Sequence, residues 1–298
     1  MFRTLFLACA VALPAHAFEL EGESGTAILD SPPESVAALS WALAEIATDL
    51  DLPLTGVADT EGYATWVAKP PLPEGVRDLG LRTEPNLEAL SDLAPELILG
   101  SDQQIDMADR LGQIAPVVIR DQFSADHDNA ETARQTYRDI AAAFGKSDLA
   151  AQRLSEIDAA MQAAGDRVRE AWGGAVPPVL PVRLMTPTTL RIHGPNSMAA
   201  AAVEGMGLTP AAGGERTEWG FVTVPIEALA DYEDAAIVRF DPFADKEALF
   251  ASPLWQAIPA VAEGRFAVAE PAWTFSSVVS LEVLAQRIAD ALVDIAPE

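Results

Sequence analysis

The feature that most constrains this chain is a long central stretch with almost nothing able to interrupt a helix. Across residues 129–172 there is no proline, and glycine occurs only at Gly145 and Gly165. Alanine, glutamine, arginine, glutamate and leucine dominate, and all are good helix formers. We expect a first helix before Gly145 and a longer one over 147–172, with Ser147 as its N-cap. Paired glycines and then paired prolines follow and end it.

On both sides of that stretch, short apolar runs alternate with segments of helical periodicity. The runs that predict strands are 36–40, 54–58, 96–100, 117–119, 179–185, 190–193, 235–240 and 266–269. Such alternation is typical of a parallel sheet covered by helices. We therefore predict an α/β fold with two Rossmann-like lobes: an N-terminal lobe over 18–145, a bridging helix over 146–173 and a C-terminal lobe over 174–298.

The first seventeen residues, MFRTLFLACAVALPAHA, have the pattern of a secretory signal peptide. Arg3 provides the positive start, a short apolar run follows, and AHA is a small-x-small cleavage site. The apolar run is too short to span a bilayer. We expect residues 1–17 to be removed on export to the periplasm, leaving 18–33 as a loose lead-in.

Composition excludes several classes of protein. With 45 acidic against 19 basic residues and a formal net charge of −26, the chain repels phosphate backbones, so no nucleic-acid partner is expected. The single cysteine, Cys9, lies in the signal segment, which excludes a disulfide framework or a cysteine nucleophile. The later histidines, His127 and His193, lack metal-ligand spacing. We predict no enzyme activity, no bound metal and no cofactor.

Three tryptophans lie in polar, loop-like contexts instead of periodic apolar segments. They are Trp66, Trp219 and Trp273. Side chains on loops at strand ends often line binding sites, although burial under a loop explains any one of them equally well. Arg82 stands just before a predicted helix, where its donor fork either pairs with a neighbouring acid or points into the crevice at the strand ends.

Several sequence blocks, in order and spacing, resemble the ferric-hydroxamate (ferrichrome) binding proteins of bacterial iron uptake. The blocks are GVADTEGYATWV (56–67), PPLPEG (70–75), GLRTEPNLEAL (80–90), HGPNSM (193–198), EWGF (218–221), SPLWQAIPAVAEGRF (252–266) and AWTF (272–275). The resemblance implies a monomeric type III periplasmic binding protein, in which one long helix joins two lobes around a shallow cleft. It also implies a ferric siderophore as cargo, and as partner an inner-membrane ABC permease with a cytoplasmic ATPase.

The resemblance also implies roles for particular residues. Arg82 would donate to hydroxamate oxygens. The aromatic cleft would be formed by Trp41, Trp66, Trp219, Trp273 and Phe275. The siderophore supplies the ligands of the iron, so the protein needs none of its own.

Departures from the family pattern bear on the cargo. The family's ligand-contacting tyrosine falls on Gln104, which can still donate a hydrogen bond, and Arg191 and His193 occupy positions that are apolar in the family. A cleft that loses rings and gains cationic donors favours a more anionic complex, such as a mixed citrate–hydroxamate siderophore.

In this family a surface glutamate on each lobe meets arginines of the permease. Glu45 matches the position in the N-terminal lobe. The matching position of the C-terminal lobe is Ala201, and Glu204, a helical turn further on, would substitute for it. The alternative is that both glutamates are merely solvated helix charges.

Other functions stay open on the sequence alone. A cobalamin or heme carrier of the same fold is one, and heme would require an axial ligand such as His193. A secreted hydrolase that uses His193 with an acid is another. An adhesion or structural module is the third.

Overall fold

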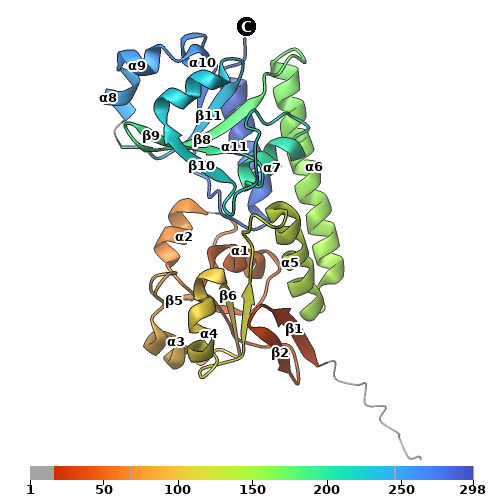
Figure 1. Cartoon of the computed structure of the whole chain (residues 1–298). Helices are drawn as coiled ribbons and strands as arrows, with labels where there is room; N and C mark the ends of the chain where they lie inside the picture. The colour runs from red at the N-terminus through yellow and green to blue at the C-terminus, as the bar shows by residue number, and fades with distance from the viewer. Residues whose placement is uncertain (1–16, 68, 245, 298) are drawn as a thin grey trace, which may run out of the picture.

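The computed structural model describes residues 17–67, 69–244 and 246–297, so the predicted signal segment lies outside the described residues except for Ala17. Two α/β lobes are stacked end to end, and the long helix α6 (Ser147–Ala171) runs beside both of them (Figure 1). The C-terminal helix α11 (Ser280–Asp294) packs along α6. The predicted fold class is therefore confirmed, while the exact lobe limits stay a prediction.

The N-terminal lobe contains a five-stranded parallel sheet. In spatial order its strands are β5 (Arg77–Asp78), β4 (Leu54–Val57), β3 (Val36–Ala38), β6 (Leu97–Ser101) and β7 (Val117–Arg120). Its helices are α1 (Trp41–Asp49), α2 (Thr60–Trp66), α3 (Leu87–Leu93), α4 (Ala108–Leu111) and α5 (Asn129–Ala143), with the 3-10 helix η1 (Asp102–Met107). β3 and β6 are buried along their whole length, as expected for strands covered on both faces. All five strands end at the same edge of the sheet.

The C-terminal lobe contains a five-stranded mixed sheet, which differs from the parallel sheet that alternation predicts. Its strands, in spatial order, are β10 (Phe221–Pro225), β9 (Thr189–His193), β8 (Val179–Thr186), β11 (Ala236–Phe240) and β12 (Phe266–Ala269). β9 is antiparallel to both of its neighbours, β8 and β10. A tight turn joins β8 to β9, and only antiparallel strands can be joined this way. The remaining helices are α7 (Met198–Gly205), η2 (Ile226–Tyr232), α8 (Lys246–Phe250), α9 (Pro253–Gln256) and α10 (Pro259–Ala262).

Two local predictions are wrong. Instead of a loose lead-in, residues 18–29 form an antiparallel hairpin of β1 (Phe18–Gly22) and β2 (Gly25–Leu29). Phe18 is buried because alternate residues of β1 face the core, and its ring meets Phe144 edge to face at 5.0 Å. Ser147 is the first residue of α6, and Lys146 occupies the N-cap.

Hydrogen bonds also join the lobes away from α6. The buried side chain of Asn129, at the start of α5, donates through Nδ2 to the carbonyls of Asn196 and Glu218, at 2.9 Å each. Asn196 donates back to the carbonyl of Ser124 at 2.7 Å. These bonds favour a fixed arrangement of the two lobes.

Candidate functional site

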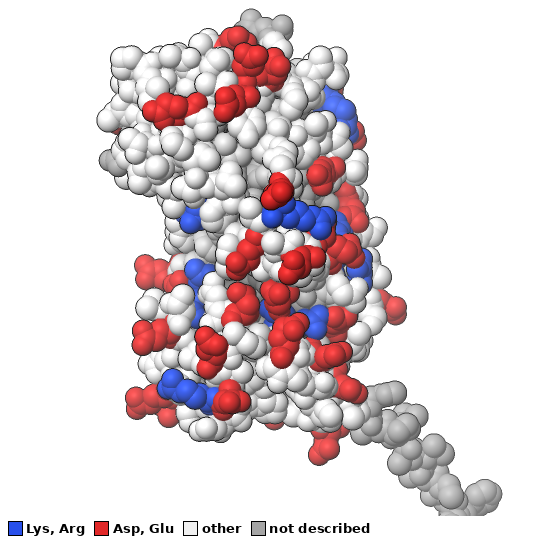
Figure 2. Space-filling model, viewed as in Figure 1, with Lys and Arg blue, Asp and Glu red and all other residues white. Residues whose placement is uncertain are grey.

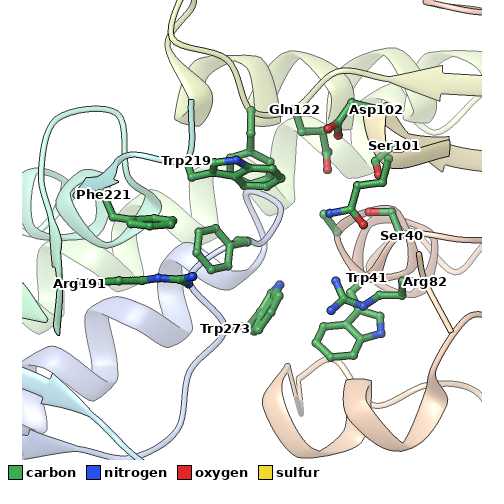
Figure 3. Close-up of a pocket in the computed structure, with 14 residues that line it drawn as sticks. Ser40, Trp41, Arg82, Ser101, Asp102, Gln122, Arg191, Trp219, Phe221 and Trp273 are labelled. Atoms are coloured by element: carbon green, nitrogen blue, oxygen red, sulfur yellow. The ribbon is translucent and has the colours of Figure 1, made fainter. Parts of the chain in front are cut away.

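An open pocket of about 260 Å³ lies between the lobes. The N-terminal lobe lines it with residues at or just beyond the carboxyl ends of its strands, which is where open α/β sheets bind ligands. These residues are Ser40, Trp41, Ala42, Arg82, Ser101, Asp102, Gln103, Gln122 and Phe123. The C-terminal lobe contributes Arg191, Trp219, Phe221, Trp273 and Phe275 (Figure 3).

Arg82 lies on the N-terminal side of the pocket between two indole rings. Its guanidinium carbon is 3.7 Å from the ring centroid of Trp41 and 5.2 Å from that of Trp273. Asp59 is 3.8 Å from its Nε, too far for a hydrogen bond. Burial lowers the pKa of Arg82, against the opposing influence of Asp59. The side chain keeps its charge because arginine starts from so high a pKa, and its planar donor fork remains available to a ligand.

The loop that carries Arg82 is held from beneath by Gln104. Gly80, in the left-handed region at φ +79°, and Pro85 form an isolated bridge that closes the loop. The buried Gln104 donates through Nε2 to the Arg82 carbonyl at 2.7 Å and accepts from the Ser101 amide at 2.9 Å. The expectation that Gln104 donates to the ligand is not met, because its amide is already bonded and does not line the pocket. Gln104 positions the Arg82 loop instead.

Aromatic rings form a continuous wall through the pocket. Trp41 contacts Trp273 at a centroid distance of 4.8 Å, and Trp273 contacts Phe275 at 5.4 Å. The ring centroid of Phe275 lies 5.7 Å from that of Trp219. Trp219 in turn stacks on Phe123 at a centroid distance of 5.3 Å. The structure thus brings together four of the five predicted aromatic residues and adds Phe123. Ligand contact by these rings stays a prediction.

Trp66 is the exception among the predicted aromatic residues. It is the last residue of α2 and not part of a loop, and it is absent from the lining of the pocket. Its ring lies 6.3 Å from that of Trp273, so it adjoins the wall without lining the pocket. The run TEGYATW contains no proline, and Asp59 caps the helix by accepting from the Gly62 amide. This cap was the sequence signal for a helix.

Arg191 enters the pocket from the opposite lobe and points toward Arg82 (Figure 3). Its guanidinium carbon lies 4.1 Å from the ring centroid of Phe221. His193, two residues further along β9, is fully buried and does not line the pocket. Burial and two nearby arginines lower the pKa of His193 to about 3, so it is neutral at physiological pH. The expectation that His193 acts as a cationic donor is therefore wrong.

Four donor groups around the pocket have no acceptor within the described residues. They are Nε of Arg82, Nε2 of Gln122, Nε of Arg191 and Nε1 of Trp273. All four residues line the pocket, and Gln122 is only 2% exposed. A buried donor without a partner is costly, at about 1–3 kcal/mol for each group. Four unpartnered donors in the residues that line one pocket suit a ligand that carries oxygen acceptors.

Sequence analysis missed Gln122, Phe123 and Phe221. Gln122 and Phe123 follow the end of β7, so their place at the carboxyl edge of a parallel sheet was an available signal. Phe221 begins β10, a strand whose second and third residues are exposed. It therefore lacks the apolar run by which the other strands were found.

Comparison with known proteins agrees with this fold. A profile of the periplasmic binding protein family matches residues 36–272. The chain belongs to this family. It is 32% identical over 276 residues to the iron(3+)-hydroxamate-binding protein FhuD of Escherichia coli (strain K12), which covers 92% of this chain and 91% of that protein. The resemblance found in the sequence blocks is confirmed.

Two solved structures share the same architecture. FhuD from Vibrio cholerae, bound to Fe3+–Desferal, superposes with a TM-score of 0.85 at 33% identity, covering 88% of this chain and 99% of that one. FhuD2 from Staphylococcus aureus, with bound ferrioxamine B, gives a TM-score of 0.70 at 15% identity over 89% of this chain and 100% of that one. The second match shows the fold alone. The type III fold is confirmed.

The two glutamates predicted to dock on a permease differ in exposure. Glu45 is 0% exposed, so it is not a surface acid. It accepts a hydrogen bond from the Ser277 amide at 2.8 Å and bonds the Ser280 hydroxyl, which joins α1 to the start of α11. Glu204, at the end of α7, is exposed, and Ala201 is partly buried. Of the two, only Glu204 keeps the exposure that docking requires.

No cluster of three or more His, Cys, Asp or Glu side chains in the described part of the chain could hold a metal ion. Among those same residues, no helix combines the length and apolarity needed to cross a membrane.

Proposed function

We propose that this chain is a periplasmic solute-binding protein that captures ferric hydroxamate siderophores and, as a monomer, delivers them to an ABC permease with a cytoplasmic ATPase. The observation that carries the proposal is the set of four unpartnered donors set in an aromatic wall. FhuD of Escherichia coli, similar along almost the whole chain, is an iron(3+)-hydroxamate-binding protein.

The chemistry of such a cargo matches this pocket. A ferric hydroxamate complex satisfies its iron with its own oxygens and presents apolar carbon with a few partly negative oxygens. Indole and phenyl rings suit the carbon surface, while Arg82 and Arg191 suit the oxygens. The cavity is small for a ligand pocket, so we expect part of a large complex to stay outside it.

The alternative functions find less support. An axial heme ligand from His193 would require the ring to face the pocket, whereas it is buried among aromatic rings. A hydrolase would require His193 to bond an acid, but neither ring nitrogen has a partner within the described residues. An adhesion module would gain nothing from unpartnered donors in a pocket.

Glu204 is the acid we propose for docking on the C-terminal lobe.

Titration with ferric desferrioxamine B tests the proposal. We expect saturable, one-to-one quenching of tryptophan fluorescence, because Trp41, Trp219 and Trp273 line the pocket. Ferric citrate, whose surface lacks the apolar carbon that the rings contact, serves as the comparison and should bind more weakly. If ferric desferrioxamine B produced no saturable change, or bound no better than ferric citrate, the proposal would be wrong.

A further inference from the structure

Two arginines lie opposite each other on neighbouring strands: Arg191 lines the pocket, and Arg183 lies next to it outside the lining. Arg183 of β8 lies directly opposite Arg191 of β9 in the antiparallel register. Like charges directly opposite each other destabilise a sheet. No carboxylate lies within ion-pair distance of either side chain across residues 17–67, 69–244 and 246–297. The pair is therefore a positive site without an internal counter-ion.

Other buried or half-buried arginines in the described part of the chain have a carboxylate as counter-ion. Arg239 lies 2.7 Å from Asp241, and Arg82 lies 3.8 Å from Asp59. The chain as a whole carries a formal net charge of −26, and acidic residues appear on both halves of the face in Figure 2, more densely on the lower half. Carboxylates are abundant on this protein, yet none reaches the Arg183–Arg191 pair. Burial lowers the pKa of both guanidiniums, and Arg191 adds to the effect on Arg183.

Aromatic stacking leaves the donor edges of both guanidiniums free. Arg183 lies over Trp66 with its guanidinium carbon 4.5 Å from the ring centroid, and Arg191 lies over Phe221 at 4.1 Å. A guanidinium covered on its face still presents its N–H groups in the plane, in a fork that matches a carboxylate. The Nε of Arg191 is buried and has no acceptor in the described part of the chain. This arrangement also gives Trp66 a role outside the pocket lining, where its ring packs against Arg183.

We infer that Arg183 and Arg191 form a carboxylate-binding subsite, and that the preferred cargo is a ferric hydroxamate complex with a free carboxylate on its periphery. The inference rests on the proposed function. It keeps the anionic cargo expected from the sequence but assigns the second cation to Arg183 in place of the neutral His193. The negative charge of the carboxylate offsets the repulsion between two like charges across the hairpin.

A matched pair of ligands tests the inference on the unmodified protein. Desferrioxamine B is succinylated on its terminal amine, which gives a carboxylate, or converted to the corresponding terminal carboxamide, which has the same length and no charge. Both ferric complexes share one iron core. We expect the carboxylate complex to bind at least about tenfold more tightly. The preference should shrink as sodium chloride is raised.

Substitutions test which residues cause the preference for the carboxylate complex. In the double variant Arg183→Gln/Arg191→Gln, the ratio of the two affinities should fall to about one, because both complexes lose the contacts of Arg191 with hydroxamate oxygens but only the carboxylate complex also loses the subsite. Arg110→Gln is the control. Arg110 is an exposed arginine on α4 with no ion-pair partner within the described residues, so its removal changes net charge but should keep the preference.

The outcomes separate the inference from the proposed function. Equal binding of both complexes by the unmodified protein would overturn the carboxylate subsite and leave hydroxamate capture intact. An undiminished preference in the double variant would overturn the assignment to these arginines. Binding of neither complex would overturn the proposed function and the inference with it.

Discussion

The free energy of unfolding is expected to be greatest between about pH 4.5 and 6.5 and to fall on either side. Burial raises the pKa of Glu45 from 4.5 to about 8, an effect that its bonds to Ser280 and Ser277 oppose and Asp49 strengthens. Burial, with the charges of Arg183 and Arg191, lowers the pKa of His193 from 6.5 to about 3. Both groups are neutral in the folded protein near neutral pH.

The two groups limit stability at opposite ends of the pH range. The folded chain keeps a proton on Glu45 that the unfolded chain releases, so this stability is complete below pH 4.5 and lost as pH rises to about 8. The folded chain excludes a proton from His193 that the unfolded chain binds, so this stability is complete above pH 6.5 and lost as pH falls to about 3. The two effects cancel between pH 4.5 and 6.5. Stability should fall by about 1.4 kcal/mol per pH unit from pH 6.5 to 8 and from pH 4.5 to 3, which is about 2 kcal/mol on each side.

Urea unfolding of the Glu45→Gln variant tests whether Glu45 causes the loss of stability between pH 6.5 and 8. The amide resembles the protonated carboxyl, since it can accept from the Ser277 amide and donate to the Ser280 hydroxyl, so the fall between pH 6.5 and 8 should disappear. Glu88→Gln, at an exposed position on α3, should keep the fall. A Glu45→Gln variant that loses as much stability as the unmodified protein over this range would contradict the assignment.

Replacing Arg82 with alanine is expected to weaken the binding of ferric desferrioxamine B by roughly 10- to 100-fold. Hydrogen bonds from a charged group contribute about 1.5–3 kcal/mol, and about 1.4 kcal/mol is a factor of ten in affinity. Arg82 is the one N-terminal guanidinium among the residues that line the pocket, and its planar fork is stacked on Trp41. Its side chain is 27% exposed and has no hydrogen bond to Asp59, so little folding stability should be lost.

Affinity measured by fluorescence titration checks this prediction. Arg82→Lys should fall between the unmodified protein and the alanine variant, because lysine keeps the charge but loses the fork and the stacking. Arg110→Ala, which removes a charge outside the pocket, should bind within about twofold of the unmodified protein. Retention of full affinity by Arg82→Ala would show that the guanidinium does not contact the ligand.

The parts of the fold that could be predicted from sequence are those whose signal is local. The bridging helix followed from the absence of breakers over 129–172, and most central strands followed from their apolar runs. The β1–β2 hairpin was missed although Phe18 and Leu20 alternate with acids, because the polar composition of 18–33 masked the alternation. Trp66 was placed in a loop because prolines follow it closely.

The site was predictable only where chain position determined it. Arg82 and Trp273 follow strands at the edge where the lobes meet, so their place in the pocket could be inferred. Glu45 and Gln104 are polar residues whose burial depends on partners far along the chain or in another loop, which no local pattern reveals. Arg183 lies beside Arg191 only because the β8–β9 hairpin pairs the two residues, and that register depends on the turn between the strands.

The position of iron in the complex tests most directly whether the protein binds a siderophore whose own oxygens hold the iron. In such a complex, aromatic rings and guanidinium groups of the protein contact the siderophore and not the metal. A crystal of the protein with ferric desferrioxamine B would locate the metal by its anomalous scattering. We predict iron in the pocket between Arg82 and Arg191, with every ligand a siderophore oxygen and none from the protein. Iron bound by a protein side chain, or a siderophore seated outside this pocket, would contradict the proposed mode of capture.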